Sequence, residues 1–529
     1  MPHPCNYAKD HPHKPAIIFC DSTASGGRSH MLTYGAYAKA INQAAHLLRS
    51  CGLGRGDHMA LMMENRMEFL VVCWAAQMVG VVYTPVSSHL RSEETAYILR
   101  NCQARLFLAS AAVAEVAVAA AADAPGLERC LMVGGIRDGF ESWEEAVDAH
   151  LTTMIDNPVN GVPMLYSSGT TGQPKGVRIQ LPEDDIDSAH PLALSLGLLF
   201  GFSDETVYLT PAPLYHAAPL HFNMMAQSLG GTSVIMEKFE EQRALALIEE
   251  FRVTHSQWVP IMFVRMLKLP EPERTRFDLS SHQLAIHAAA PCPVETKEQM
   301  IAWWGEIVYE YYGASESIGA TLIDSAQWLA HRGSVGPAVA GELHIVDDEG
   351  RELPPGEIGT VYFGGSQASF SYHDEPEKTA SSYNQQGWAT TGDVGYLDEE
   401  GYLYLTDRKH FMIISGGVNI YPQEVENLLI THEKVADVAV FGVPHAEFGE
   451  EVKAVVQPIN WGDATDLVAI ELMEWLRERL AHFKVPRSID FEEALPRLDN
   501  GKLYKRHLVE AYRSAAGAEP DSGSGSDSG

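Results

Sequence analysis

The segment 164–177, Met-Leu-Tyr-Ser-Ser-Gly-Thr-Thr-Gly-Gln-Pro-Lys-Gly-Val, carries the residue types that surround phosphate groups. Backbone N–H groups in a loop of small hydroxyl and glycine residues can approach phosphate oxygens closely, and Lys175 adds a positive charge. The segment is not a Walker A loop, because Lys175 is followed by Gly176 rather than by Ser or Thr. A plain surface turn is the alternative interpretation. On its own, the composition favours a loop that binds the phosphates of a nucleotide.

A second group of candidates lies between residues 288 and 316. In Tyr312-Gly-Ala-Ser-Glu316 the tyrosine ring can stack on adenine, Ser315 can bond a phosphate oxygen, and Glu316 can help to hold Mg²⁺ against phosphates. The run Ala288-Ala-Ala-Pro291 offers backbone and small side chains, which suit a wall for a flat purine edge. Taken alone, the first segment is an ordinary strand-ending turn and the second is a packed strand end.

Three further segments lie toward the C-terminus. In Thr391-Gly-Asp393 the carboxylate could accept protons from both ribose hydroxyls, although an isolated Gly-Asp is commonly just a turn. Residues 407–426 read as a charged hairpin, an apolar strand, a double glycine and a proline-started helix, which is a much more specific pattern. Lys502 follows a glycine turn, where a lysine is ordinarily solvated.

The elements that must position these segments follow from the hydrophobic pattern. Helical and strand-like stretches alternate from about residue 30 to 200, and later strands continue this pattern, which predicts a mainly parallel sheet covered by helices. Expected helices are 33–50, 68–79 and 111–123, and expected strands are 59–63, 80–85, 207–211, 232–236, 256–259 and 284–287. Beyond about residue 333, short strands at 342–346, 359–363 and 402–405 indicate a small antiparallel sheet or barrel.

The region 412–515 has a compact α+β pattern of its own. Strands are expected near 412–415, 437–443 and 451–458, with helices near 423–430 and 465–481. The final residues 517–529 are Gly, Ser, Asp and similar residues that cannot bury apolar surface, so we expect them to be disordered.

Composition limits the partners and the compartment. A net charge of -32 over 529 residues argues against nucleic acid or an anionic membrane surface as the main partner. The 7 cysteines are scattered and never form C-x-x-C, which favours reduced, mostly buried thiols. No His-Glu-x-x-His, signal peptide or run of about 18 apolar residues occurs. These features predict a cytoplasmic protein that spans no membrane.

Taken together, the segments resemble the adenylate-forming superfamily in composition, order and spacing from about residue 10 to 512. That superfamily comprises acyl-CoA synthetases, aryl-CoA ligases, peptide-synthetase adenylation domains and beetle luciferases, and Gly54–Asp57 and Gly80–Pro85 match its early signatures. The resemblance implies an α/β fold: two doubly wound β-α subdomains plus a small distorted β-barrel in a large N-terminal domain, 1–407. The resemblance implies that this domain is followed by a hinge at 408–411, a mobile α+β domain at 412–515 with a catalytic lysine, and a tail at 516–529.

The resemblance also implies a reaction in two halves. A carboxylate attacks the α-phosphate of ATP, giving an acyl-adenylate and pyrophosphate, and a thiol then displaces AMP. Positioning and charge neutralisation carry such a reaction. Lys502, His216, Glu316 and Thr170 would be catalytic, and Glu316 would also hold Mg²⁺. The ATP- and AMP-binding residues would be Ser167, Ser168, Gly169, Thr170, Thr171, Gly172, Lys175, Ala289, Ala290, Pro291, Tyr312, Gly313, Ala314, Ser315, Asp393, Arg408 and Lys502.

By the same resemblance, the small domain rotates after adenylation. The pivot falls on His410, where the family usually has Asp or Lys, so this histidine departs from the pattern; it either makes rotation pH-sensitive or is a tolerated polar hinge. Ser415, Gly416 and Gly417 would line the channel for coenzyme A. The acyl pocket would be formed by His216, Ala217, Phe222, Ala288, Ala314 and Ile318, of which His216 is alternatively a structural histidine.

Within the superfamily several activities compete. Peptide-synthetase domains usually place an aspartate, which pairs with a substrate ammonium, where this chain has Ala217. A non-catalytic homologue is disfavoured, because Glu316, Asp393, Arg408 and Lys502 are all retained, and a luciferase-like activity is rare in the fold. The sequence therefore favours an AMP-forming acyl-CoA ligase, closest to fatty-acyl-CoA synthetases, that uses ATP, Mg²⁺ and coenzyme A. The uncharged pocket candidates indicate an acid with an uncharged tail. A free-standing enzyme that loads a carrier protein is the alternative, and a homodimer is expected from family habit.

Overall fold

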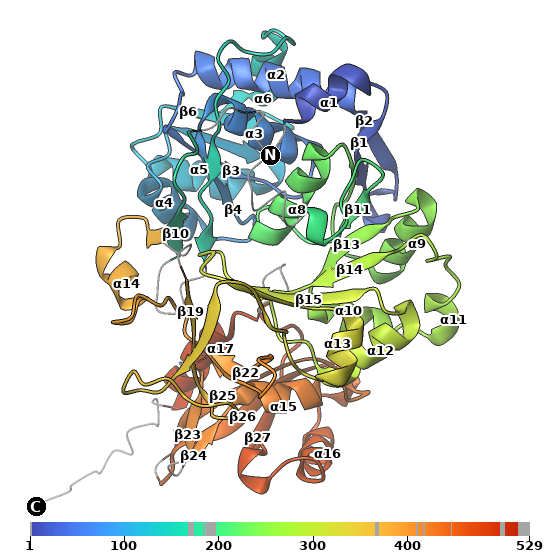
Figure 1. Ribbon diagram of the computed structural model, residues 1–529, viewed down its shortest axis with the longest axis vertical. Coiled ribbons are helices and arrows are strands. Elements are labelled where there is room, and N and C mark those ends of the chain that lie inside the picture. The colour runs from blue at the N-terminus through green and yellow to red at the C-terminus, as the bar shows by residue number, and fades with distance from the viewer. Residues whose placement is uncertain are drawn as a thin grey trace, which may run out of the picture.

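The computed structural model describes residues 3–167, 174–183, 186, 197–365, 370–408, 411–415, 418–445, 447–497 and 503–516. Figure 1 shows the N-terminal elements in blue at the top and the C-terminal elements in orange and red at the bottom. Two mainly parallel sheets with their helices fill the upper and middle parts. The α/β architecture expected from the sequence is confirmed.

The first large sheet has six strands, all parallel, in the order β7-β6-β5-β3-β4-β8. Its strands read as continuous apolar runs because helices cover both faces. Helix α2 begins where Thr33 Oγ1 accepts the N–H of Ala36 at 3.4 Å, a hydroxyl cap that ends the preceding strand. The elements are α1 (Pro4–Asp10), α2 (Tyr34–Ser50), β3 (His58–Met62), α3 (Met67–Val79), β4 (Val82–Val86), α4 (Ser92–Asn101), β5 (Leu106–Ser110), α5 (Ala114–Ala122), β6 (Arg129–Val133), β7 (Glu141–Ser142), α6 (Trp143–Asp148) and β8 (Val162–Pro163).

The second large sheet has nine strands in the order β17-β16-β15-β14-β13-β11-β12-β1-β2. Its central strands are parallel, and antiparallel strands close both edges. Alternating residues along β14 face two different cores: Ala285 packs with α9, α10 and α12, whereas Ile286 packs with α8. The elements are β1 (Pro15–Cys20), β2 (Ser29–Thr33), β11 (Val207–Thr210), α8 (Ala217–Ser228), β12 (Thr232–Met236), α9 (Glu241–Phe251), β13 (His255–Trp258), α10 (Pro260–Leu267), α11 (Glu271–Arg274), β14 (Leu284–His287), α12 (Val294–Trp304), β15 (Val308–Gly313), β16 (Ala320–Ile323), α13 (Ser325–Ala330) and β17 (Ala338–Ala340).

Two small antiparallel sheets stand beside the large ones. One has four strands in the order β18-β19-β21-β22, and the other has three in the order β20-β10-β9. The four-stranded sheet is the small antiparallel sheet predicted beyond about residue 333, whereas the three-stranded sheet also uses strands from residues 166–178, which the sequence pattern did not predict. Their elements are β9 (Tyr166–Ser167), β10 (Lys175–Arg178), β18 (Glu342–Val346), β19 (Gly359–Gly364), β20 (Ser371–Tyr372), α14 (Pro376–Ser381), β21 (Asp393–Leu397) and β22 (Leu403–Arg408).

The C-terminal domain has a hydrophobic core around β25 and β26, which pair antiparallel over ten registered positions, and Val264 of α10 also belongs to this core. Strands β23, β24 and β27 complete its sheet, and Figure 1 shows this unit below the rest of the molecule. Its elements are β23 (Ile413–Ser415), β24 (Val418–Ile420), α15 (Pro422–Leu429), β25 (Val435–His445), β26 (Gly449–Pro458), α16 (Asp466–Arg477), β27 (Ser488–Phe491) and α17 (Lys505–Ala516). Helix α17 reaches the first residue of the predicted tail, and 517–529 lie outside the described residues.

Nearly every element expected from the sequence is present within a few residues of its predicted bounds. The prediction of reduced cysteines is also confirmed: all seven are free thiols, and Cys5, Cys20, Cys73 and Cys102 are buried. No helix in the described part of the chain is long and apolar enough to cross a membrane.

Candidate functional site

Tyr312, Asp393 and Arg408 come together from three strands and form the centre of the candidate site. The hydroxyl of Tyr312 donates to Asp393 Oδ2 at 2.7 Å, and Thr391 Oγ1 donates to the same oxygen at 2.8 Å. Arg408 Nε lies 3.0 Å from Asp393 Oδ1. The nearby carboxylate raises the pKa of Arg408, and burial together with Asp393 raises the pKa of Tyr312. The cluster is therefore a fixed carboxylate between a phenol and a guanidinium.

The register of the small four-stranded sheet explains this cluster. Asp393 begins β21 and Arg408 ends β22, and the two residues are paired directly across the antiparallel ladder. The ladder shifts between Val394 and Gly395, where Gly395 is required because a Cβ would lie 2.4 Å from the carbonyl oxygen of Tyr404. Tyr312 approaches from the end of β15 in the nine-stranded sheet. The cluster thus joins two sheets.

A second cluster contains Glu316, Tyr372 and Lys175. The hydroxyl of Tyr372 donates to Glu316 Oε1 at 2.8 Å, and Lys175 Nζ lies over the Tyr372 ring, 4.9 Å from its centroid. Glu316 is only 7% exposed. Partial burial lowers the pKa of Lys175, a shift that Lys378 reinforces. Tyr372 therefore contacts the Lys175 ammonium through its ring and the Glu316 carboxylate through its hydroxyl.

Lys175 stands at the base of the phosphate-loop hairpin. Strands β9 and β10 pair antiparallel, with Lys175 opposite Ser167 and Gly176 opposite Tyr166. Gly176 fits this hairpin because a Cβ would lie 3.0 Å from the Tyr166 ring. The predicted loop residues Ser168, Gly169, Thr170, Thr171 and Gly172 lie outside the described residues, as does the side chain of Ser167.

The predicted adenine wall follows β14. Ala288 is buried, Ala289 and Pro291 are exposed, and Ala290 is half-buried. Ala289 has φ +78°, a left-handed conformation that costs energy for a residue with a Cβ. Ser317, next to Glu316, has φ +54°. Strained backbone therefore lies at the ends of both β14 and β15, where the candidate site lies.

The rest of the 312–316 segment stays near the surface of this edge. Gly313 is exposed, and Ala314 and Ser315 are half-buried. The backbone turns back on itself here, because Ser317 N donates to the carbonyl of Ala314 at 3.0 Å. Polar groups of this segment can therefore meet a ligand that lies along Tyr312.

The predicted acyl-pocket residues divide between three places. Phe222 on α8 packs in an aromatic cluster with Phe200, Phe202, Tyr208 and Ile286. His216 is the N-cap residue of α8, half-buried, with its ring 4.4 Å from that of Tyr215. Ala217, however, packs against the core of the first large sheet, and Ile318 packs with Phe363 in the small-sheet core. The structure therefore brings Phe222 and the end of β14 together but not all six candidates.

The remaining candidates belong to the C-terminal domain. Ser415 is the last residue of β23 and is half-buried. His410, Gly416, Gly417 and Lys502 lie outside the described residues. Among the residues that the structure does describe, no group of three or more His, Cys, Asp and Glu side chains could hold a metal ion.

Comparison with known proteins identifies the family. The sequence signature of "AMP-binding enzyme" matches residues 6–373, and that of "AMP-binding enzyme C-terminal domain" matches residues 424–502. This chain belongs to the family of AMP-binding enzymes. The second signature falls within the domain that we predicted at 412–515.

Relatives of this AMP-binding enzyme align over almost its whole length. The long-chain-fatty-acid–CoA ligase FadD13 of Mycobacterium tuberculosis is 31% identical over 490 residues, covering 91% of this chain and 93% of the relative. A feruloyl-CoA synthase of Amycolatopsis sp is 32% identical over 506 residues, covering 95% and 96%. Full-length similarity to several CoA ligases places this AMP-binding enzyme among the acid–thiol ligases that use ATP and coenzyme A.

Solved structures of one further relative, MatB from Rhodopseudomonas palustris, resemble the whole chain. ATP-bound MatB matches with a TM-score of 0.79 at 29% identity, covering 97% of this chain and 100% of that chain. Apo MatB matches with a TM-score of 0.67 at 28% identity, covering 97% and 99%. The arrangement of this AMP-binding enzyme is thus more similar to the ATP-bound structure.

Sequence reasoning missed Tyr372 and Thr391 as members of the site. Tyr372 lies on a strand of two residues, too short to leave a periodic pattern. Thr391 is adjacent to the recognised Gly392-Asp393, and its hydroxyl bonds the Asp393 carboxylate two residues later in the chain. The sequence pattern around Tyr372 does not predict its contact with Glu316. Nor does the pattern around Thr391 predict that it bonds the same Asp393 oxygen as Tyr312.

Proposed function

We propose that this AMP-binding enzyme activates a carboxylic acid with an uncharged tail and transfers the acyl group to coenzyme A. In the first half-reaction a carboxylate oxygen bonds to the α-phosphorus of ATP, and the bond to the β-phosphate breaks to release pyrophosphate. In the second, the thiol sulfur bonds to the acyl carbon, loses its proton, and displaces AMP. The observation that carries the proposal is that the Tyr312–Asp393–Arg408 cluster lies close to the Glu316–Tyr372–Lys175 cluster, since Glu316 contributes, after Asp393, to raising the pKa of Arg408.

Asp393 suits the ribose end of ATP. A carboxylate is an acceptor group that can bond to the hydroxyls of a ribose. The donors on Asp393 come from Tyr312, Thr391 and Arg408, and they fix its orientation before ATP binds. The guanidinium of Arg408 stays protonated, and its positive charge favours a phosphorylated ligand. The exposed backbone at Ala289 and Gly313 supports adenine beside the Tyr312 ring.

Glu316 fits a magnesium ligand. Magnesium is typically held by one or two carboxylates together with substrate phosphates and water, rather than by a complete set of protein ligands. A buried glutamate whose Oε1 is held by Tyr372 supplies one such oxygen, next to the cation Lys175. When bound, the ion would neutralise phosphate charge. Lys175 and residues 168–173 would contact the pyrophosphate end, and Lys502 would counter charge where the carboxylate meets the α-phosphate.

The acid would extend toward the aromatic cluster on the α8 face of the sheet. The members named above, Phe200, Phe202, Phe222 and Ile286, are buried and uncharged, which suits an apolar or aromatic tail. A charged tail would lose its hydration among these uncharged side chains. His216 stands at the start of α8, where it would orient the carboxylate.

The test is pyrophosphate release from ATP across short, medium, long and aromatic acids, with and without coenzyme A. Thioester formed only with coenzyme A, from acids with uncharged tails, is the expected result. Adenylates trapped by hydroxylamine without any thioester would instead support the carrier-loading alternative. Asp393→Asn should lower pyrophosphate release, whereas Asp398→Asn, on the loop after β21, should leave it unchanged. Hinge motion at His410, coenzyme A binding at Ser415–Gly417, a homodimer and a cytoplasmic location remain predictions.

A further inference from the structure

Helix α15 is the first helix of the C-terminal domain, and the N-terminal domain contacts it at both ends. At its N-terminus the N-cap residue Tyr421 makes no side-chain cap. The vacant capping position is filled from the other domain, because Asp407 Oδ2 accepts the N–H of Gln423 at 3.1 Å. Asp407 lies near the end of β22, immediately before Arg408 and the predicted hinge. A negative charge thus meets the positive end of the helix dipole.

At the other end of α15 the contact has the opposite sign. Lys268, which directly follows α10, donates to the carbonyl of Ile430 at 3.2 Å and also to the carbonyl of Val435. Ile430 is the C-cap residue of α15. The last carbonyls of a helix lack partners within the helix and carry its negative partial charge. The Lys268 ammonium group therefore gives these carbonyls a hydrogen-bond donor and also complements the negative end of the α15 dipole.

An apolar contact accompanies the two polar ones. Val264 on α10 is buried in the same cluster as Leu429, Ile430 and Val435 of the C-terminal domain. Ile261 packs against that cluster from the same helix. Figure 1 shows α10 in the middle part of the molecule and α15 below it, in the C-terminal domain. Helix α15 thus lies between an acidic residue, an apolar face and a basic residue of the N-terminal domain.

These three contacts require one relative orientation of the domains. Rotation of the C-terminal domain relative to the nine-stranded sheet would carry α15 away from Lys268 and Val264, which stay with that sheet. We propose that Asp407 and Lys268 form a two-ended clamp on α15 that holds the C-terminal domain in its adenylating orientation and must release before the thiol step. The clamp rests on the proposed function for its role, and on the greater similarity to ATP-bound than to apo MatB for the orientation that it holds.

The test separates the two half-reactions in Lys268→Met, which keeps an apolar stem and removes the charge. The dipole contact predicts a roughly two- to fivefold slower adenylate formation, with thioester formation from a supplied acyl-adenylate unchanged or faster. Lys268→Glu should have a larger effect in the same direction. The matched control is Lys434→Met, because the Lys434 ammonium pairs with Glu471 inside the C-terminal domain at 2.6 Å.

Small-angle scattering gives a readout that does not depend on activity. We expect the radius of gyration of the free enzyme to increase in Lys268→Met and Lys268→Glu but not in Lys434→Met. Equal slowing of both half-reactions, or variants that match the control in rates and scattering, would overturn the clamp. If the wild-type enzyme forms no adenylate with any acid, the proposed function fails, while the scattering comparison still decides whether the clamp exists.

Discussion

Tyr312 and Asp393 share a hydrogen bond of 2.7 Å that connects the nine-stranded sheet to the small four-stranded sheet. The phenol and the carboxylate lie 81 residues apart in sequence. Since Arg408 occupies the other carboxylate oxygen, the orientation of Asp393 is set by donors from both sheets. A ligand that contacts Asp393 therefore meets a group that is already positioned, which lowers the entropy lost on binding.

Tyr312→Phe should weaken ATP binding while it preserves the aromatic face for adenine. We expect the loss of this hydrogen bond to weaken ATP binding by about 1 kcal/mol, which corresponds to a roughly fivefold higher KM for ATP. Steady-state kinetics with saturating acid and coenzyme A would measure this change. Tyr396→Phe is the control, since that ring stacks on Tyr404 in the same small sheet with centroids 4.9 Å apart. Equal KM values in the two variants would contradict the positioning role.

Glu316→Gln should raise the magnesium concentration needed for half-maximal pyrophosphate release, because it removes a carboxylate and keeps the side-chain size. We expect a shift of about 10- to 100-fold, as is typical when groups around a metal are changed. Tyr372→Phe removes only the donor to Glu316 Oε1 and should give a smaller shift in the same direction. A magnesium titration that coincides with the wild-type curve would exclude Glu316 as a ligand.

The sequence predicts the elements of this site better than their contacts. Strand ends at Ala288 and Tyr312 follow from apolar runs, because the period of a buried strand is local information. The pairing of Asp393 with Arg408 depends on a register that shifts at Gly395, and no local pattern encodes that shift. The contact between Lys268 and Ile430 joins residues 162 positions apart. Such contacts arise from packing between domains, which a single sequence does not display.

Protonation of His282 should make the fold sensitive to mild acid. Burial lowers the pKa of His282 to about 3, and its ring lies 2.6 Å from Ser256 Oγ and against Trp304. Between pH 6.5 and 3 the unfolded chain binds a proton that the folded chain excludes, so stability falls as pH falls. This linkage amounts to about 2 kcal/mol at pH 5. Thermal melting at pH 7 and pH 5 should show a smaller difference for His282→Gln than for wild type, and an identical difference would contradict the assignment.

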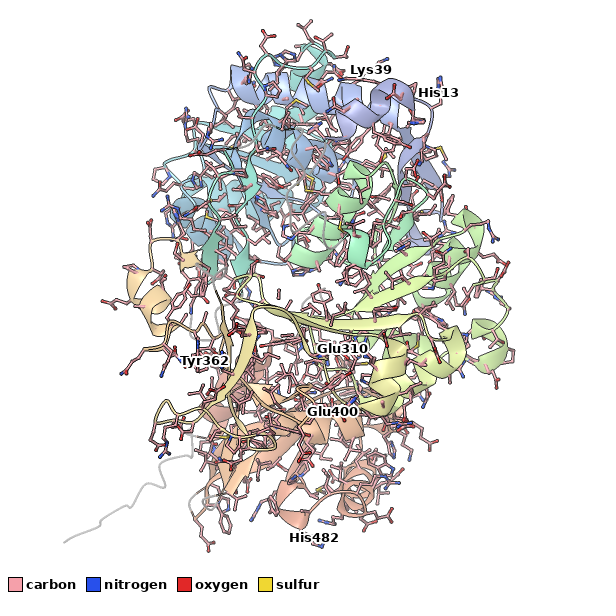
Figure 2. The ribbon with its side chains drawn as sticks, viewed as in Figure 1. His13, Lys39, Glu310, Tyr362, Glu400 and His482 are labelled. Atoms are coloured by element: carbon pink, nitrogen blue, oxygen red, sulfur yellow. The ribbon has the colours of Figure 1, made fainter. Side chains whose placement is uncertain are left out.

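Lys297 and Glu310 form a buried ion pair beneath the candidate adenine wall. Lys297 Nζ lies 2.6 Å from Glu310 Oε2 and 4.9 Å from the centroid of the Trp328 ring, and the lysine side chain is 0% exposed. Glu310, labelled near the middle of the molecule in Figure 2, is on the same strand as Tyr312. Burial raises the pKa of Glu310, and the charge and hydrogen bond of Lys297 oppose that shift.

Removal of one partner should therefore cost more than removal of both charges. Lys297→Met leaves an uncompensated buried carboxylate, and we expect it to lower stability by about 3–5 kcal/mol. Adding Glu310→Gln removes the second charge and should restore at least half of that loss, because the remaining polar atoms no longer carry a desolvated charge. Thermal and urea unfolding of the wild type, both single variants and the double variant would complete the cycle. Additive losses in the double variant would show that Lys297 and Glu310 act independently and that the pair does not support the strand that carries Tyr312.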